Sequence, residues 1–175
     1  MKRNNEELIK AAREKARDYF KTGMNCAECV LKAVLDLGLS DLPPSVIALA
    51  TGFGGGIGLS GNNCGALSGA ILAVSSVHGR TNPLAGEKIA DRIEQLNGEQ
   101  GVYRLFNQIP KTFQEKFGEV NCGQLVKDFQ WHSREQGKFC QDLIGEGAAI
   151  AVYWILAGSQ EGYGYPFGPN VGGYR

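Results

Sequence analysis

The feature that most constrains this chain is the stretch Thr51–Gly79, TGFGGGIGLSGNNCGALSGAILAVSSVHG. It begins with a glycine-rich run, 52–61, continues through Cys64, and ends in a segment, 66–77, that is apolar nearly all round. A helix without a polar face is expected in a protein core. We therefore expect a flexible loop with few side chains to meet the buried centre of the fold at Cys64.

The remaining segments also show helical periodicity, because apolar residues recur every three to four positions and no segment alternates as a half-buried strand would. The 175 residues are enough for one domain with a substantial core. We predict an all-α, single-domain fold over 1–175, a bundle of about seven helices. The candidate helical segments are 6–20, 25–37, 45–50, 66–77, 84–96, 100–117, 122–132 and 138–156.

The C-terminal segment 159–175 is rich in Gly, Tyr and Pro and has no periodicity. We expect an irregular tail that packs through its aromatic side chains or stays mobile. Positive and negative side chains balance at 18 each, which gives no indication of nucleic-acid binding. The N-terminus is charged, unlike a secretion signal, and the longest apolar run, 147–158, is shorter than the about 20 residues of a membrane span. We expect a cytoplasmic protein without a membrane span.

Five cysteines in such a compartment are expected to be thiols, metal ligands or redox centres rather than structural disulfides. Cys26, Cys64 and Cys122 each follow an asparagine, a good N-cap residue, and Cys140 is expected in the first turn of the last helix. Helix N-termini offer free N–H groups and partial positive charge, which stabilise thiolates. We predict that these four cysteines form one catalytic or metal-binding site, holding an iron–sulfur cluster, another thiolate-bound metal or a reactive dithiol.

Cys26 and Cys29 also form a C-x-x-C pair, which is able to cycle between dithiol and disulfide. The pair is not a haem attachment motif, because Val30 stands where a histidine is needed. A structural zinc site usually has two close pairs of ligands, and here only one pair is close. We therefore predict no haem, an iron–sulfur cluster as the candidate cofactor and zinc as the weaker alternative.

The glycines around Cys64 have both functional and structural interpretations. The run 56–61 fits G-x-G-x-x-G but lacks the strand and the acidic residue of a dinucleotide-binding unit. Its N–H groups would instead hold an anion or donate to cluster sulfurs, or the run is only a tight turn. Gly65 and Gly69 are candidate cofactor-binding positions, and the alternative is that they let a neighbouring helix approach closely.

The order of these motifs carries a family resemblance. Cys26 is followed by the glycine loop, by C-G-A-L-S-G at 64–69, and then by Cys122 and Cys140. Over about Ala16–Trp154 the chain resembles the redox-active proteins named for their C_GCAxxG_C_C pattern. The resemblance implies a small α-helical redox or metal-binding protein. Related sequences occur in split-Soret cytochromes, which bind haem and an iron–sulfur centre.

The leading hypothesis is a redox protein whose four family cysteines form one site, and whether it is an oxidoreductase stays open. The alternatives are a non-catalytic ligand- or partner-binding module, which would use the glycine loop and aromatic tail, and a zinc-stabilised scaffold. We expect an unidentified redox partner, no nucleic acid, and a homodimer built on the apolar central and C-terminal helices. Cys29 lies outside the family's four cysteines and is either a resolving partner for Cys26 or a buried hydrophobic residue.

Overall fold

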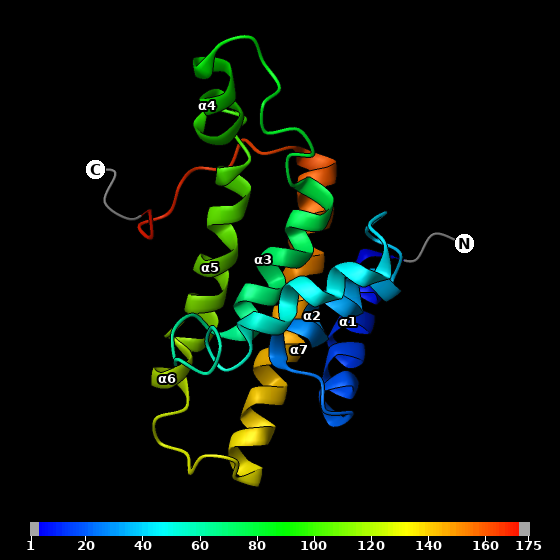
Figure 1. Cartoon of the computed structure of the whole chain (residues 1–175), viewed down its shortest axis with the longest axis vertical. Helices are drawn as coiled ribbons and strands as arrows, with labels where there is room; N and C mark the ends of the chain where they lie inside the picture. Colours follow the sequence, from blue (N-terminus) through cyan, green and yellow to red (C-terminus); the bar gives the residue numbers. More distant parts are fainter. Residues whose placement is uncertain (1–3, 172–175) are drawn as a thin grey trace.

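The computed structural model describes residues 4–171, and over that range the chain is helical without a β-sheet. Seven α-helices and one 3-10 helix follow one another along the chain, so the predicted all-α fold of about seven helices is confirmed (Figure 1). The elements are α1 (Asn5–Lys21), α2 (Cys26–Asp36), η1 (Pro44–Phe53), α3 (Gly65–His78), α4 (Ile89–Asn97), α5 (Tyr103–Phe117), α6 (Cys122–Leu125) and α7 (Arg134–Glu161).

The core lies where α3 and α7 pack against α1, α2 and α5. Figure 1 shows α7 running along most of the molecule, with α5 on one side and α1 on the other. The expectation that the apolar segment 66–77 is central is confirmed, since Ala66, Ala70, Ala73 and Val74 are fully buried in α3. Small side chains on this helix allow several neighbours to surround it.

Two glycines lie where helices cross closely. A Cβ atom at Gly69 would lie 2.7 Å from the carbonyl oxygen of Ala27, and one at Gly147 would lie 2.8 Å from that of Ala66. The backbones of α2 and α3, and of α3 and α7, therefore approach at distances that only glycine permits. The packing interpretation of Gly69 is confirmed, and its role in cofactor binding stays a prediction.

Several predicted helix boundaries were wrong because local capping decides them. The last helix begins at Arg134 rather than 138, since Ser133 is an N-cap whose hydroxyl accepts from the Gln136 N–H at 3.1 Å. The segment predicted as helix 122–132 ends at Leu125, and its continuation contains His132 with a φ of +63°. The short helix predicted at 45–50 is present as the 3-10 helix η1, and it extends over Pro44–Phe53.

The tail packs through its aromatic side chains over the residues that the structure describes, and 172–175 lie outside them. The hydroxyl of Tyr163 lies 3.0 Å from Nδ1 of His78, and Nε2 of that histidine lies 2.9 Å from the Ile155 carbonyl. The Tyr165 ring stacks edge-on against Trp154, with centroids 5.2 Å apart. These contacts anchor the tail to the ends of α3 and α7.

Glu146 of α7 joins three helices through ion pairs. Its carboxylate accepts two hydrogen bonds from the Arg13 guanidinium of α1, at 2.6 and 3.1 Å, and one from Lys116 of α5 at 2.6 Å. Burial alone would raise the pKa of Glu146, but the hydrogen bonds from Arg13 and Lys116 outweigh it and lower the pKa. The pairs hold α1 and α5 against α7.

By length and composition α7 is apolar enough to cross a membrane. Within its most apolar 18-residue window, however, 56% of the residues are buried inside the protein. The core helix of a soluble protein passes the same test, so α7 gives only weak evidence for a membrane span.

Candidate functional site

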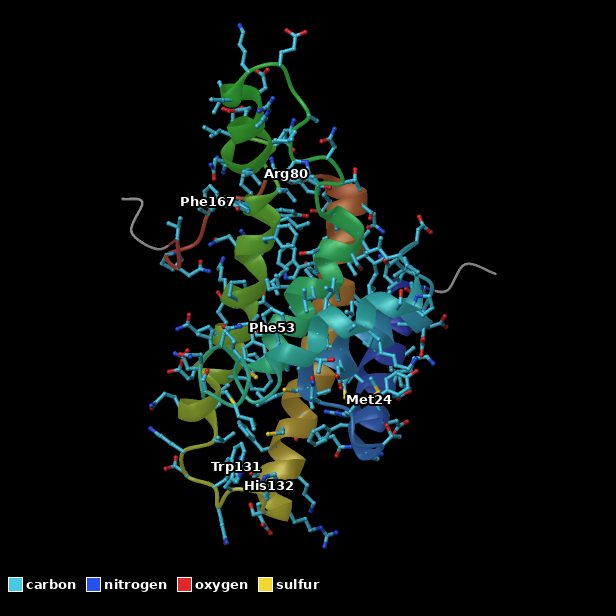
Figure 2. The ribbon with its side chains drawn as sticks, viewed as in Figure 1. Met24, Phe53, Arg80, Trp131, His132 and Phe167 are labelled. Carbon is cyan, nitrogen blue, oxygen red and sulfur yellow. The ribbon has the colours of Figure 1, made fainter. Side chains whose placement is uncertain are left out.

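The four predicted cysteines come from four separate segments that the fold brings together. Cys26 opens α2, Cys64 precedes α3, Cys122 opens α6, and Cys140 lies in α7. Burial raises the pKa of the last three thiols, and charge repulsion from an ionised Cys26 raises each of them further. Such repulsion acts over short distances. Cys26 therefore lies within electrostatic range of each of the other three thiols, and all of them are free. Figure 2 shows yellow sulfur atoms between the helices below the labelled Phe53.

Cys26 occupies the predicted first position of its helix. The side-chain oxygen of Asn25 accepts hydrogen bonds from the N–H groups of Ala27 and Glu28, each at 3.0 Å, and the Glu28 carboxylate accepts from the Asn25 N–H. This capping box fixes the first turn of α2. Burial raises the pKa of Cys26, while N–H groups of Gly55, Cys26 and Ala27 act in the opposite direction.

Gly65 leaves room for the Cys26 sulfur. A Cβ atom at position 65 would overlap Sγ of Cys26 and would lie 2.8 Å from the Phe53 carbonyl oxygen. The glycine that follows Cys64 in the motif is thus required because a sulfur from another helix packs against its backbone. Its predicted contact with a cofactor stays a prediction.

A short antiparallel bridge aligns Cys64 with Cys122. Asn63 pairs with Asn121 in this bridge. The N–H of Cys64 donates to the Val120 carbonyl oxygen at 2.8 Å. The N–H of Cys122 donates to the Asn62 carbonyl oxygen at 2.7 Å. Side chains alternate between the two faces of paired extended segments, so the two cysteines project to the same face. Because the bridge is a single residue pair, the sequence around it shows no alternation of apolar and polar residues. The bridge was therefore not predicted from the sequence.

The capping prediction was wrong for Cys64. Cys64 is itself the N-cap of α3, and the Asn63 side chain donates to the Ser68 hydroxyl at 2.9 Å instead of capping the helix. No side-chain cap hydrogen bond forms, although the N–H groups of Ala66 and Leu67 oppose the rise in the Cys64 pKa. The sulfur still meets the positive end of α3.

The other two helix starts also differ from the prediction. Asn121 precedes Cys122, but its side chain donates to Glu119 Oε1 at 3.1 Å and does not cap α6. Cys140 lies in the second turn of α7, because that helix already begins at Arg134. Cys140 is therefore not at a helix N-terminus, contrary to the prediction.

Burial dominates the acid–base behaviour of the site. It raises the pKa of Cys64 to about 12 and that of Cys140 to about 11. Among residues 4–171, no cationic side chain contributes to the pKa shift of any of the four cysteines. The protein alone therefore favours thiols over the predicted thiolates, and an additional positive charge is needed to stabilise the anions.

The cysteine side chains have the right chemistry to bind a metal ion or an iron–sulfur cluster, but their positions do not form a binding site. Thiolates are the usual ligands of iron–sulfur clusters and a common ligand of zinc. In the part of the chain that the structure describes, no three His, Cys, Asp or Glu side chains converge closely enough to hold a metal ion. The described side-chain positions therefore do not by themselves form a metal site.

Cys29 lies apart from this chemistry. Its side chain is fully buried, and its sulfur lies 3.6 Å from the Met24 carbonyl oxygen. Burial, and then repulsion from ionised Cys26, raises the Cys29 pKa to about 12. These properties are those of a buried, unreactive thiol.

Two residues near Cys26 were missed by sequence reasoning. The Thr51 hydroxyl donates to Glu28 Oε1 at 2.8 Å, and Nδ2 of Asn25 donates to the Thr51 carbonyl oxygen at 3.1 Å. The Asn-x-x-Glu spacing of a capping box was a signal for Glu28. Thr51 had no such signal, because its partners lie far away in the sequence.

A separate cavity of about 680 Å³ lies between α5 and the tail. Aromatic rings of Tyr103, Phe106 and Phe167 line it together with side chains of asparagine residues. Ligand sites commonly have this size and this mixture of apolar and polar groups. No cysteine lines the cavity.

Comparison with known proteins agrees with the cysteine pattern. The chain is 31% identical over 149 residues to a protein of Archaeoglobus fulgidus that is described only as "Uncharacterized protein", and the match covers 84% of this chain and 94% of that protein. No solved structure matches the chain. The family model described as "Putative redox-active protein (C_GCAxxG_C_C)" matches residues 24–153, so the chain belongs to the C_GCAxxG_C_C family.

Proposed function

We propose that this protein is a redox protein in which Cys26, Cys64, Cys122 and Cys140 together bind an iron–sulfur cluster. The observation that carries the proposal is that the buried Cys64 and the half-buried Cys122 and Cys140 all lie within electrostatic range of Cys26, while no cationic side chain among residues 4–171 contributes to their pKa shifts. Several thiolates repel one another strongly in a buried site, and a cluster containing iron cations supplies the missing positive charge. A bound cluster would carry single electrons.

The surrounding chain suits this role. Cys64 is only 4% exposed, so water and competing thiols reach it poorly. Exclusion of water and N–H groups directed at cysteine sulfur are two means by which proteins set cluster potentials. Burial raises the pKa of Cys26, and the Gly55 N–H acts in the opposite direction, in favour of the anionic form. The glycine loop thus has the role of a donor to cluster sulfurs in this proposal.

Anaerobic purification followed by visible spectroscopy and assays of iron, zinc and sulfide tests the proposal. We expect a brown protein with iron and sulfide, and loss of both in Cys64→Ser. Cys29→Ala is the matched control, because it removes another buried thiol outside the family's four and should retain the cluster. A colourless protein without iron would overturn the proposal. Stoichiometric zinc together with unfolding in a chelator would indicate the zinc-stabilised scaffold instead.

The second candidate is thiol–disulfide exchange, which is favoured by the side-chain placement because no three potential metal ligands converge within residues 4–171. Cys26 and Cys64 are the expected pair, since Cys26 is the strongest charged neighbour of Cys64 and its sulfur packs against Gly65. Their two thiols would become one disulfide, while a partner disulfide accepts two electrons and two protons and is released as two thiols. Thiol counts before and after mild oxidation test this chemistry: a loss of two thiols, absent in Cys64→Ser, supports it.

A third candidate is a non-catalytic binding module, which the cavity between α5 and the tail favours. Its aromatic and amide lining suits a neutral planar molecule. In this case Cys64→Ala would lower only the stability, by about 1–3 kcal/mol, and would leave any redox signal unchanged. A redox signal that depends on Cys64 excludes this candidate.

A further inference from the structure

The glycine loop contains a left-handed turn at residues 55–59. All five residues have φ angles between +59° and +74°, and two of them, Ile57 and Leu59, are not glycine. A left-handed conformation is unfavourable for any residue with a side chain, and it is a clear outlier for a β-branched residue such as isoleucine. The turn is therefore strained at two positions where glycine would relieve the strain.

Packing of the side chains does not explain why the turn keeps this conformation. Ile57 and Leu59 are 46% and 73% exposed, and neither packs against the hydrophobic core. Backbone hydrogen bonds hold the turn instead, since the Gly58 N–H donates to the Gly52 carbonyl oxygen at 2.8 Å and the Leu59 N–H donates to the Gly54 carbonyl oxygen at 3.0 Å. A segment with few apolar contacts and exposed side chains is expected to open before the core does.

Asn62 connects the turn to Cys122. Its N–H donates to the Gly56 carbonyl oxygen at 3.1 Å, and its own carbonyl oxygen accepts from the Cys122 N–H at 2.7 Å. Gly56 also lies directly on this cysteine, because a Cβ atom added there would be 2.7 Å from Cβ of Cys122. The turn therefore covers one side of Cys122 and is bonded to its backbone through a single residue.

Neighbouring hydrogen bonds extend this connection to Cys64. The Gly61 carbonyl oxygen accepts from the Gly123 N–H at 2.8 Å, and the Cys64 N–H donates to the Val120 carbonyl oxygen at 2.8 Å. Figure 1 shows the loop beside α6. Cys64 is only 4% exposed, so a reagent reaches its sulfur only after a neighbouring segment has moved. The strained turn leads directly into Cys64, which makes it the segment expected to move.

We propose that the left-handed turn 55–59 is a strained gate whose opening controls the access of oxidants and partner thiols to Cys122 and Cys64. The inference goes beyond the proposed function, because it concerns the free thiols and holds for any chemistry that they perform. A substitution that adds strain increases the open fraction, and one that removes strain decreases it. Where the gate closes faster than a thiol reacts, the reaction rate follows the open fraction.

Two glycines of the loop allow strain to be separated from steric clash. Nothing lies within 4 Å of a Cβ atom added at Gly58 or at Gly52, but φ is +59° at Gly58 and lies outside the left-handed region at Gly52. Gly58→Ala therefore adds backbone strain without a clash, and Gly52→Ala is its matched control. Ile57→Gly acts in the opposite direction, because it removes strain, although the greater flexibility of glycine offsets part of the gain.

Alkylation with N-ethylmaleimide tests the gate in the full-length protein, purified with reductant and chelator and followed at each cysteine by mass spectrometry. We expect the rates at Cys64 and Cys122 to rise about tenfold in Gly58→Ala, to fall about threefold in Ile57→Gly and to stay unchanged in Gly52→Ala. Amide hydrogen exchange within 55–62 should change in the same directions. Cys29 is fully buried in the core and should react far more slowly in every variant.

Unchanged alkylation rates at Cys64 and Cys122 in folded Gly58→Ala overturn the inference. If that variant does not fold, Ile57→Gly decides the question alone, and an unchanged rate there counts against the gate. Equal rates at Cys29 and Cys64 would also overturn it, because both thiols would then be reached by global unfolding. None of these readouts depends on iron or on a redox signal, so failure of the proposed function is distinguishable from failure of the gate.

Discussion

The sulfur of Cys26 occupies the space that a side chain at Gly65 would fill. This contact interlocks the first turn of α2 with the first turn of α3, next to Cys64. Gly65 has no positive φ, so its lack of a side chain matters for space and not for backbone freedom. The C-G step of the family motif is in this way explained by a cysteine from a different segment.

Gly65→Ala is expected to displace the Cys26 sulfur. The added methyl group would also meet the Phe53 carbonyl, so we expect a loss of about 1–3 kcal/mol in the free energy of unfolding and a loss of the redox signal. Urea unfolding and the spectral assay measure the two effects. Gly137→Ala is the control, because nothing lies within 4 Å of its added Cβ and alanine favours the helix. An unchanged spectrum in Gly65→Ala would contradict the prediction.

The stability of the reduced, metal-free protein should fall at alkaline pH. Burial raises the Cys64 pKa from 9.0 to about 12, so the unfolded chain loses this proton near pH 9 while the folded chain retains it. The stabilisation from this raised pKa is complete below pH 9 and is lost as the pH rises towards 12, at a rate of about 1.4 kcal/mol per pH unit at most. Urea unfolding at pH values from about 8 to about 10.5 measures how steeply the free energy of unfolding falls with pH.

Cys64→Ala provides the comparison for this slope. Tyr19 and Tyr165 also have pKa values raised to about 12, first by burial and then by hydrogen bonds to carboxylates, and they contribute in the same direction. The difference between wild type and variant isolates the thiol. Equal slopes in the two proteins would show that Cys64 titrates normally in the folded state.

Glu146→Gln is expected to lower the free energy of unfolding by about 1–3 kcal/mol, because it removes the charge that Arg13 and Lys116 bind. The pKa of Glu146 is lowered in the folded protein, so its contribution is complete above its usual value of 4.5 and is lost as the pH falls through the folded value. The variant should therefore lose less stability than the wild type below pH 4.5. Glu14→Gln is the control, since Glu14 forms only an exposed pair with Lys10 at 3.9 Å.

Tyr163→Phe should loosen the tail at the end of α3. It removes the hydroxyl beside Nδ1 of His78 and leaves that nitrogen unpaired, at an expected cost of about 0.5–1.5 kcal/mol. Thermal unfolding measures the change. Tyr153→Phe serves as the control, because the Tyr153 ring is 52% exposed and its hydroxyl makes no hydrogen bond within the described residues. Equal effects of the two substitutions would indicate that the tail contact contributes nothing.

Features governed by neighbouring residues were predictable. The buried position of the segment 66–77 followed from its lack of a polar face, and the start of α2 at Cys26 followed from a cap at Asn25. Both signals lie within one or two helical turns. The early start of α7 at Arg134 was equally local, and Ser133 was the cap that the prediction overlooked.

Contacts between distant segments were not predictable in the same way. Asn63 and Asn121 share the sequence pattern of Asn25, but a pairing between their own backbones replaces helix capping. The hydrogen bond between Thr51 and Glu28 likewise joins two segments that show no local sign of each other. A capping residue has several competing partners, and the approach of another segment decides among them.

By itself the sequence determined an all-α chain in which four cysteines follow in the order of the C_GCAxxG_C_C family, because helical periodicity and motif spacing are properties of consecutive residues. Only the tertiary structure decided that the other three thiols lie within electrostatic range of Cys26 and that Cys140 comes from the second turn of its helix. It also decided that burial raises the pKa of the thiols, which capping alone would have lowered. The physical reason is that desolvation depends on every segment that covers a sulfur, whereas a helix N-terminus acts only on its own first turn.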